Sequence, residues 1–258
     1  MGEGVSLKFF SALLWCFPLA VIAMQLLPIE YSFVIGVALV AFGFTKGFRV
    51  LLLFGLTIFG YLFWLFAAQY LTTSISNTSL LIILNRLGLM GYIILFAIWA
   101  QVEPCVGYLK QGSMKETLKA PLIWWGNNEY IWRFVVIVCS LWAVPTIIFT
   151  FLHGNIIAFM PYALLFAVIN PIFEGMVWRG FILGRVVDYI GEKQGLIISS
   201  IAFGLYHLSL GFSIWICLLF GIGGFYMGGL AIKSKGFLAP TIVHFFVNLA
   251  LISFGIIF

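Results

Sequence analysis

The side chains that could carry chemistry lie in the last third of an otherwise largely apolar chain. Glu174, His207, His244 and Asn248 each fall inside a hydrophobic segment, and two of the three histidines of the chain are among them. Ionisable groups inside membrane helices are energetically costly, so they are rare and usually functional. Carboxylates and imidazoles are also the groups that proteins use for general acid–base catalysis. Their concentration in three hydrophobic segments predicts a hydrolytic site within a membrane.

Helical spacing relates several polar residues to one another. Asn170 precedes Glu174 by four residues, so the two share one face of a helix. His244 and Asn248 are also one turn apart, and both are expected to face the interior of a bundle, because lipid would leave them unsatisfied. Arg179 follows Glu174 by five residues. In a regular α-helix these two side chains point about 140° apart, so a direct ion pair is not expected.

Each of these residues also has a purely structural interpretation. Arg179 could be a membrane anchor whose charged end reaches the interface, and Glu174 could be a hydrogen-bonded structural carboxyl group. His207 could be a satisfied core residue. His244 and Asn248 could form an interhelical hydrogen bond worth about 1 kcal/mol. Their combination on three separate segments favours one shared site over several independent structural roles.

Composition places the chain in a membrane. Of its 258 residues, 64% are hydrophobic and only 8% are charged, whereas soluble domains have roughly 25% charged residues. The net charge of +5 comes from basic residues scattered in short segments, so no nucleic-acid partner is expected. The four cysteines show no spacing that indicates a disulfide framework or a zinc site. The lipid bilayer is therefore the expected surroundings.

Apolar segments predict the fold class, which is all-α: a polytopic transmembrane helix bundle with about eight or nine spans. The predicted spans are residues 7–27, 31–44, 48–71, 79–100, 131–152, 159–183, 195–211, 213–232 and 237–257. The polar segment 101–130 is predicted to be a cytoplasmic interfacial loop with a helix that holds Trp124 and Trp125 at headgroup level. We expect residues 1–130 to form N-terminal transmembrane helices plus this loop, and residues 131–258 to form the catalytic transmembrane core.

The basic residues predict the orientation. When nine spans are threaded with the N-terminus in the cytoplasm, only Arg86 fails to fall on the cytoplasmic side, as the positive-inside rule requires. The basic residues on that side are Lys8, Lys46, Arg49, Lys110, Lys115, Lys119, Arg133, Arg179, Arg185, Lys193, Lys233 and Lys235. Compact loops and no visible targeting extension favour an integral, multi-pass protein of a bacterial inner membrane.

Three short motifs resemble those of a known family. The segments Glu174–Arg179, Phe203–His207 and His244–Asn248 resemble the CPBP (ABI) family of CAAX proteases and bacteriocin-processing intramembrane proteases. The family motifs are a double glutamate with an arginine four residues after the second, Phe-xxx-His, and His-xxx-Asn/Asp. Their order and internal spacing match over about residues 131–257. One position departs from the pattern, because the second glutamate of the family is Gly175 here.

The resemblance implies a glutamic-type intramembrane endopeptidase. Glu174 would activate a water molecule with the help of His207, while His244 and Asn248 would donate hydrogen bonds to the oxyanion. The supporting residues would be Arg179, Phe203 and Asn170. The partner would be a peptide or protein substrate in the membrane, cleaved near its terminus. No cofactor and no metal ion are expected.

Other functions stay open at the level of the sequence. Gly175 suggests a non-proteolytic membrane scaffold or regulator of the same family, which would bind a sensor kinase or another protein. Two histidines and a carboxylate could hold zinc with an open fourth position, which would make a metal-dependent membrane protease, although the HExxH spacing is absent. A transporter would require a pseudo-symmetric repeat of discontinuous helices, and the sequence shows no such repeat.

Overall fold

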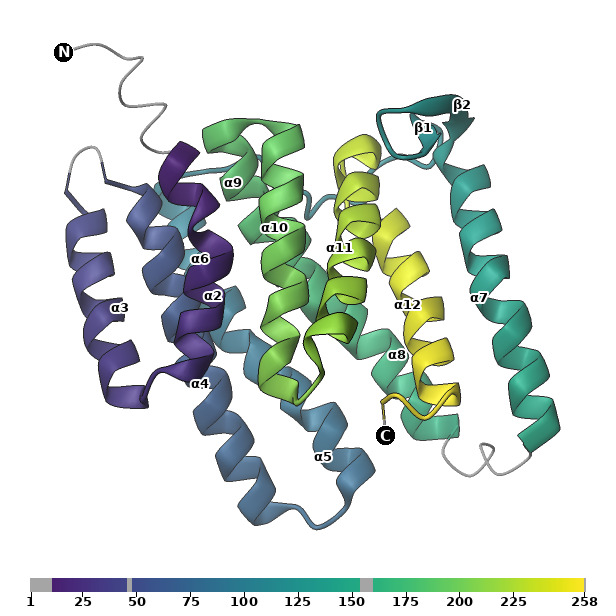
Figure 1. Cartoon of the computed structure of the whole chain (residues 1–258), viewed down its shortest axis with the longest axis horizontal. Helices are drawn as coiled ribbons and strands as arrows, with labels where there is room; N and C mark the ends of the chain where they lie inside the picture. The colour runs from purple at the N-terminus through teal and green to yellow at the C-terminus, as the bar shows by residue number, and fades with distance from the viewer. Residues whose placement is uncertain (1–10, 46–47, 154–159, 258) are drawn as a thin grey trace.

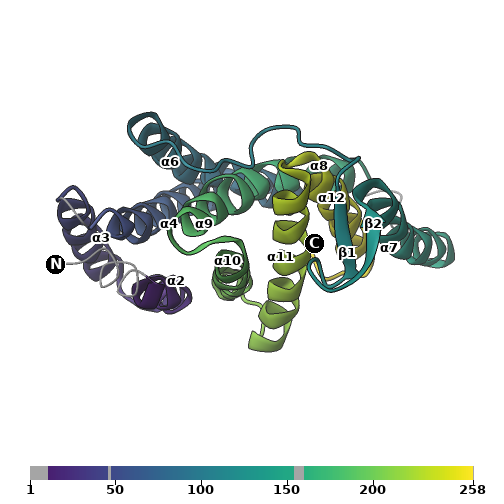
Figure 2. The same cartoon turned by 90° about the horizontal axis from the view of Figure 1, so that it is seen from above.

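Helices packed side by side form nearly all of the computed structural model, which describes residues 11–45, 48–153 and 160–257. Figure 2 shows α2 and α3 at one edge and α7 at the other, with α10 and α11 between them. The helical elements are α2 (Phe17–Leu26), α3 (Ile29–Gly43), α4 (Val50–Ser74), α5 (Thr78–Leu84), the 3₁₀ turn η1 (Asn85–Leu89), α6 (Met90–Val102), α7 (Ile131–His153), α8 (Met160–Glu174), the π-helix η3 (Gly175–Ile182), α9 (Leu183–Ile190), α10 (Glu192–Tyr206), the 3₁₀ turn η4 (His207–Leu210), α11 (Ile214–Ser234) and α12 (Leu238–Ser253).

Several helical segments can cross a membrane by length and composition. In the part of the chain that the structure describes, five such segments are Val50–Ser74, Thr78–Val102, Ile131–Leu152, Met160–Ile190 and Ile214–Ser234. Three shorter apolar helices are Phe17–Leu26, Ile29–Gly43 and Leu238–Ser253. The prediction of an all-α polytopic bundle is confirmed, whereas the number of membrane crossings stays a prediction.

The connections between helices alternate between the two ends of the bundle (Figure 1). The α3–α4 connection, the segment between α6 and α7, the α9–α10 turn and the α11–α12 turn lie at the end drawn uppermost. Arg49, Lys110 and Lys235 belong to these segments, and Lys193 lies in the first turn of α10 at the same end. Lys8 and Lys46, which the orientation argument also used, lie outside the described residues, as does the connection 154–159. The side of the membrane that this end faces stays a prediction.

The segment 101–130 contains strands where an interfacial helix was predicted, so that prediction was wrong. Strands β1 (Thr117–Pro121) and β2 (Gly126–Tyr130) pair in antiparallel register, with Thr117 opposite Tyr130. The alternation of buried and exposed residues in β1 explains why a strand forms instead of a helix. Leu118 is buried against Ile131 and α7 while both of its neighbours are exposed, and this alternation fits a strand and not a helix.

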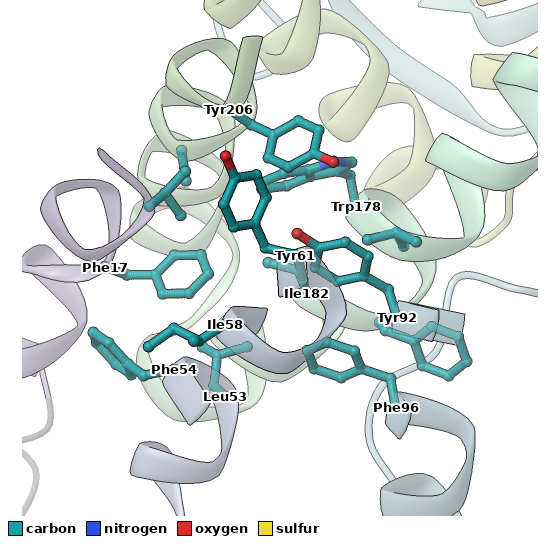
Figure 3. Close-up of a cluster of buried hydrophobic side chains, with 14 of the residues drawn as sticks. Phe17, Leu53, Phe54, Ile58, Tyr61, Tyr92, Phe96, Trp178, Ile182 and Tyr206 are labelled. Atoms are coloured by element: carbon teal, nitrogen blue, oxygen red, sulfur yellow. The ribbon is translucent and has the colours of Figure 1, made fainter. Parts of the chain in front are cut away.

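The largest hydrophobic cluster joins the two halves of the chain. It contains Phe17 of α2, Leu53 of α4 and Phe96 of α6, together with Ile182 of η3 and Phe203 of α10. Figure 3 shows part of this cluster. Residues on both sides of position 130 therefore pack in one core, which fixes α8 and η3 against the N-terminal helices.

Candidate functional site

Glu174 lies where one helix changes its geometry. It ends α8, and the next eight residues, Gly175–Ile182, form a π-helix. A π-helix has i→i+5 hydrogen bonds and often occurs at functional sites. The wider turn rotates Arg179 nearer to the face of Glu174 than a regular α-helix would, so the regular α-helix assumed from the sequence was wrong here. No ion pair joins Arg179 and Glu174 in the described structure, as the sequence argument expected.

The two oxygens of the Glu174 carboxylate have different surroundings. Oε1 lies 3.4 Å from Nη1 of Arg86, and Oε2 lies 3.7 Å from Nε2 of His244. Within the described residues Oε2 receives no hydrogen bond. The whole residue is only 2% exposed. The carboxylate is thus bound at one oxygen, while the other oxygen is buried and faces His244 without a hydrogen bond among the described residues.

Arg86 is the site residue that the sequence argument missed. It lies in η1 of the span Thr78–Val102 and is buried. Its Nη1 atom donates to Oδ1 of Asn170 at 3.3 Å and to Glu174, and its guanidinium lies 5.4 Å from the ring centroid of Phe166. A signal was present in the sequence, since Arg86 was the only basic residue that broke the positive-inside pattern. A lone charge inside an apolar span marks a candidate site.

Arg179 is buried among groups that give it no carboxylate contact. Its Nη2 atom donates to the sulfur of Met227 at 3.1 Å, and its guanidinium lies 4.4 Å from the ring centroid of Phe203. Its Nη1 atom has no hydrogen-bond partner among the residues described. A buried position of this kind differs from that of a membrane anchor whose charged end reaches water.

His207 is positioned by the end of α10. It begins the 3₁₀ turn η4, and its Nδ1 atom lies 2.8 Å from the carbonyl oxygen of Phe203. A ring nitrogen that bonds a carbonyl oxygen carries the proton, so Nε2 of the neutral ring is the acceptor. No hydrogen bond between the side chains of His207 and Glu174 is present in the described part of the chain.

His244 and Asn248 lie one turn apart on α12, and both are buried. His244 faces Glu174, as the 3.7 Å distance from Nε2 to Oε2 shows. The Nδ2 atom of Asn248 has no hydrogen-bond partner among the described residues. The His244 ring and this unpartnered donor thus lie one helical turn apart on α12, with His244 next to Glu174.

Aromatic rings border the site on the side of the N-terminal helices. The Trp178 and Tyr206 rings lie 5.5 Å apart, and the Tyr92 ring lies 6.2 Å from that of Tyr206. Figure 3 shows these three rings together with Tyr61. Trp178 follows Glu174 by one π-helical turn, and Tyr206 directly precedes His207. The aromatic cluster thus packs beside the site residues Glu174 and His207.

A metal site is not assembled in the part of the chain that the structure describes. No three His, Cys, Asp or Glu side chains come close enough together there to hold an ion. The buried charges near Glu174 are instead the guanidinium groups of Arg86 and Arg179. The arrangement suits proton transfer by the carboxylate together with hydrogen-bond donation by its neighbours.

Taken together, the helical bundle and its buried carboxylate and imidazole groups define a membrane-embedded candidate active site. Residues 156–250 match a family model described as type II CAAX prenyl endopeptidase Rce1-like. The resemblance to the CPBP family is thereby confirmed for this part of the chain. The matched segment contains Glu174, His207, His244 and Asn248, whereas Arg86 lies outside it. Comparisons with curated proteins and with solved structures gave no match.

Proposed function

We propose that the protein is an intramembrane endopeptidase that hydrolyses a peptide bond near the terminus of a membrane-associated peptide or protein. The observation that carries this proposal is the buried Glu174 carboxylate, with one oxygen bound by Arg86 and the other open beside His244. The endopeptidase family matched by residues 156–250 supports it. A purely structural ion pair would not explain why Oε2 of Glu174 and the amide of Asn248 both have no hydrogen-bond partner among the described residues.

The proposed reaction begins with a water molecule at Oε2 of Glu174. Its proton passes to the carboxylate while its oxygen attacks the scissile carbonyl carbon, which is general base catalysis. Glu174 then returns the proton to the amide nitrogen as the C–N bond breaks, and the carboxylate is restored. The acceptor Nε2 of His207 assists by orienting the water. No cofactor takes part in these steps.

The oxyanion that forms on the carbonyl oxygen needs donors that are already in place. We assign this role to His244 and Asn248, because preorganised donors in a buried site contribute the largest single part of many rate accelerations. The low exposure of both residues strengthens the effect, since electrostatic interactions are stronger where water is excluded. Arg179, Phe203 and Asn170 support the site through the contacts described above.

The experiment that tests this function is quantitative analysis of protein termini in membranes of the native host. Wild type, a deletion strain, Glu174→Ala and the control Glu129→Gln are expressed at equal level and compared. Glu129 lies in β2, away from the site. We expect termini that are present in wild type and in the control and absent from the deletion and from Glu174→Ala. These termini would also name the substrate.

Gly175 favours a second candidate function, a membrane scaffold or regulator without proteolytic activity. A Cβ atom at this position would lie 3.2 Å from a ring carbon of Phe237. The Phe237 ring therefore packs against Gly175, the position at which the resembling family has its second glutamate. If Glu174→Ala restores every deletion phenotype and no terminus changes, the protease proposal fails and the scaffold takes its place.

A further inference from the structure

The only charged residue of the span Thr78–Val102 lies against the open carboxylate described above. Arg86 is the only Asp, Glu, Lys, Arg or His side chain among these residues. A charge in the middle of such a span faces the interior of the bundle or a polar cavity. In the structure this side chain faces the candidate site, because its Nη1 atom donates hydrogen bonds to both Asn170 and Glu174.

We propose that Arg86 is a positioning residue for the general base: it holds Oε1 of Glu174 and leaves Oε2 directed toward His244 and the proposed water site. This inference rests on the proposed function for the role of Glu174. It goes beyond that function by assigning part of the site to the N-terminal half of the chain, outside the segment that matches the family model.

The geometry supports positioning in three ways. First, Asn170 and Glu174 are one turn apart on α8, and the shared donor fixes both side chains on the same face. Second, Phe166, one turn before Asn170, lies beneath the guanidinium, so the arginine is itself held in place. Third, the span changes to a 3₁₀ turn at Asn85–Leu89, the segment that carries Arg86. Such interruptions within a helix often mark functional positions.

Electrostatics explains why this arginine would matter for the base. A carboxylate buried without a countercharge takes up a proton instead of remaining charged. Arg179 interacts with Glu174 at longer range but makes no ion pair with it in the described structure. Arg86 is therefore the cation that contacts the carboxylate directly. Without it, the carboxylate would lose this contact and be free to rotate away from His244, so the base would no longer be held in place.

The first test measures the state of Glu174 without any substrate. Dicyclohexylcarbodiimide modifies protonated carboxyl groups in apolar surroundings, and mass spectrometry of the peptide that contains Glu174 quantifies the adduct. We expect little modification in the purified wild type. Arg86→Gln should increase it at least about tenfold, the change that about 1.4 kcal/mol of lost contact energy produces in an equilibrium, because the carboxyl group released from the guanidinium can meet the reagent. Arg86→Lys keeps the charge and should stay close to wild type.

A matched control comes from Arg185, another buried arginine. It bonds the backbone oxygen of Glu103 and lies 3.9 Å from the ring centroid of Trp99, away from Glu174. Arg185→Gln should therefore leave the modification of Glu174 unchanged. If Arg86→Gln folds poorly, the double variant Arg86→Gln with Glu174→Gln removes both charges and should recover thermal stability, which is the coupling expected of a contacting pair. Equal modification in wild type and Arg86→Gln, or no recovery in the double variant, would overturn the proposal.

The second test links this contact to proteolysis. In the host, the termini that depend on Glu174 should fall about a hundredfold in Arg86→Gln, the scale expected when a catalytic group is misplaced by about 1 Å. Arg86→Lys should restore part of the signal, and Arg185→Gln should retain it. If Glu174→Ala removes these termini and Arg86→Gln does not, the positioning role fails while the function stands. If Glu174→Ala removes none, the function fails, and the carbodiimide result still decides whether Arg86 holds the carboxylate.

Discussion

At the scale of single residues, the two oxygens of the Glu174 carboxylate have different partners, and this difference favours a candidate base over a purely structural ion pair. Arg86 contacts one oxygen, and the other faces His244 without a hydrogen bond among the described residues. A buried ion pair that serves only stability needs its remaining lone pairs satisfied, because desolvation otherwise exceeds the attraction. In the proposed reaction, this second oxygen is the one that bonds the attacking water molecule.

The Asn248 amide leads to a prediction at the same scale. Asn248→Ala should lower the rate of proteolysis by roughly 10²–10³, the cost of removing one oxyanion donor. Its Nδ2 atom bonds no described residue, so little folding stability should be lost. The measurement is the abundance of Glu174-dependent termini at equal expression. Ser253→Ala, another buried polar residue of α12, is the control and should retain wild-type levels. An unchanged rate in Asn248→Ala would remove this residue from the oxyanion role.

At the scale of elements, the change from α8 to the π-helix decides which side chains meet. A regular α-helix through Glu174 would rotate Arg179 away from its observed position, whereas the π-helical turn places it against Met227 and Phe203. The same turn lets Trp178 contact Tyr206. One local change in helix geometry therefore arranges both the charged and the aromatic neighbours of the carboxylate.

The hairpin at one end of the bundle gives a second prediction. Gly126 has a φ of 118°, and a Cβ there would overlap the carbonyl oxygen of Ala120. Gly191, in the α9–α10 turn, has a φ of 80° with open space around it. Gly191→Ala should cost only the backbone strain, about 1–3 kcal/mol, and Gly126→Ala should cost more because strain and overlap combine. Thermal unfolding in detergent compares them, and equal losses would contradict the overlap argument.

At the scale of the whole molecule, the candidate site is assembled from segments far apart in the sequence. Arg86 comes from the span Thr78–Val102, and the other groups come from α8, η4 and α12. The largest core cluster likewise joins α2, α4 and α6 to η3 and α10. The N-terminal helices therefore do more than anchor the matched segment, because their packing places Arg86 against Glu174.

Orientation in the membrane is the third prediction. Ser76 lies in the α4–α5 connection at one end of the bundle, and Lys115 lies in the α6–α7 segment at the other (Figure 1). Both side chains are exposed. In a cysteine-free background, a membrane-impermeant maleimide should label Ser76→Cys in intact bacterial spheroplasts, and should label Lys115→Cys only after permeabilisation. The reverse labelling pattern would show that the N-terminus is not cytoplasmic.

The sequence by itself determined the class of the fold and the candidates for the site. Long apolar stretches predict membrane helices because the backbone must satisfy its own hydrogen bonds in lipid. Polar residues such as Glu174, His244 and Asn248 are conspicuous within them because burying such groups is costly. These signals are local in the chain, so they can be read from composition and spacing without knowledge of the packing.

The tertiary structure alone decided what those residues contact. The α-helical period gave no sign of the π-helix after Glu174, and an apolar period did not show that Leu118 lies in a hairpin that packs on α7. The pairing of Arg86 with Glu174 joins residues 88 positions apart. Such a contact depends on how helices pack, and packing is set by the shapes of many side chains together. A charge that only broke the orientation rule in the sequence therefore became, in the folded chain, the partner of the proposed base.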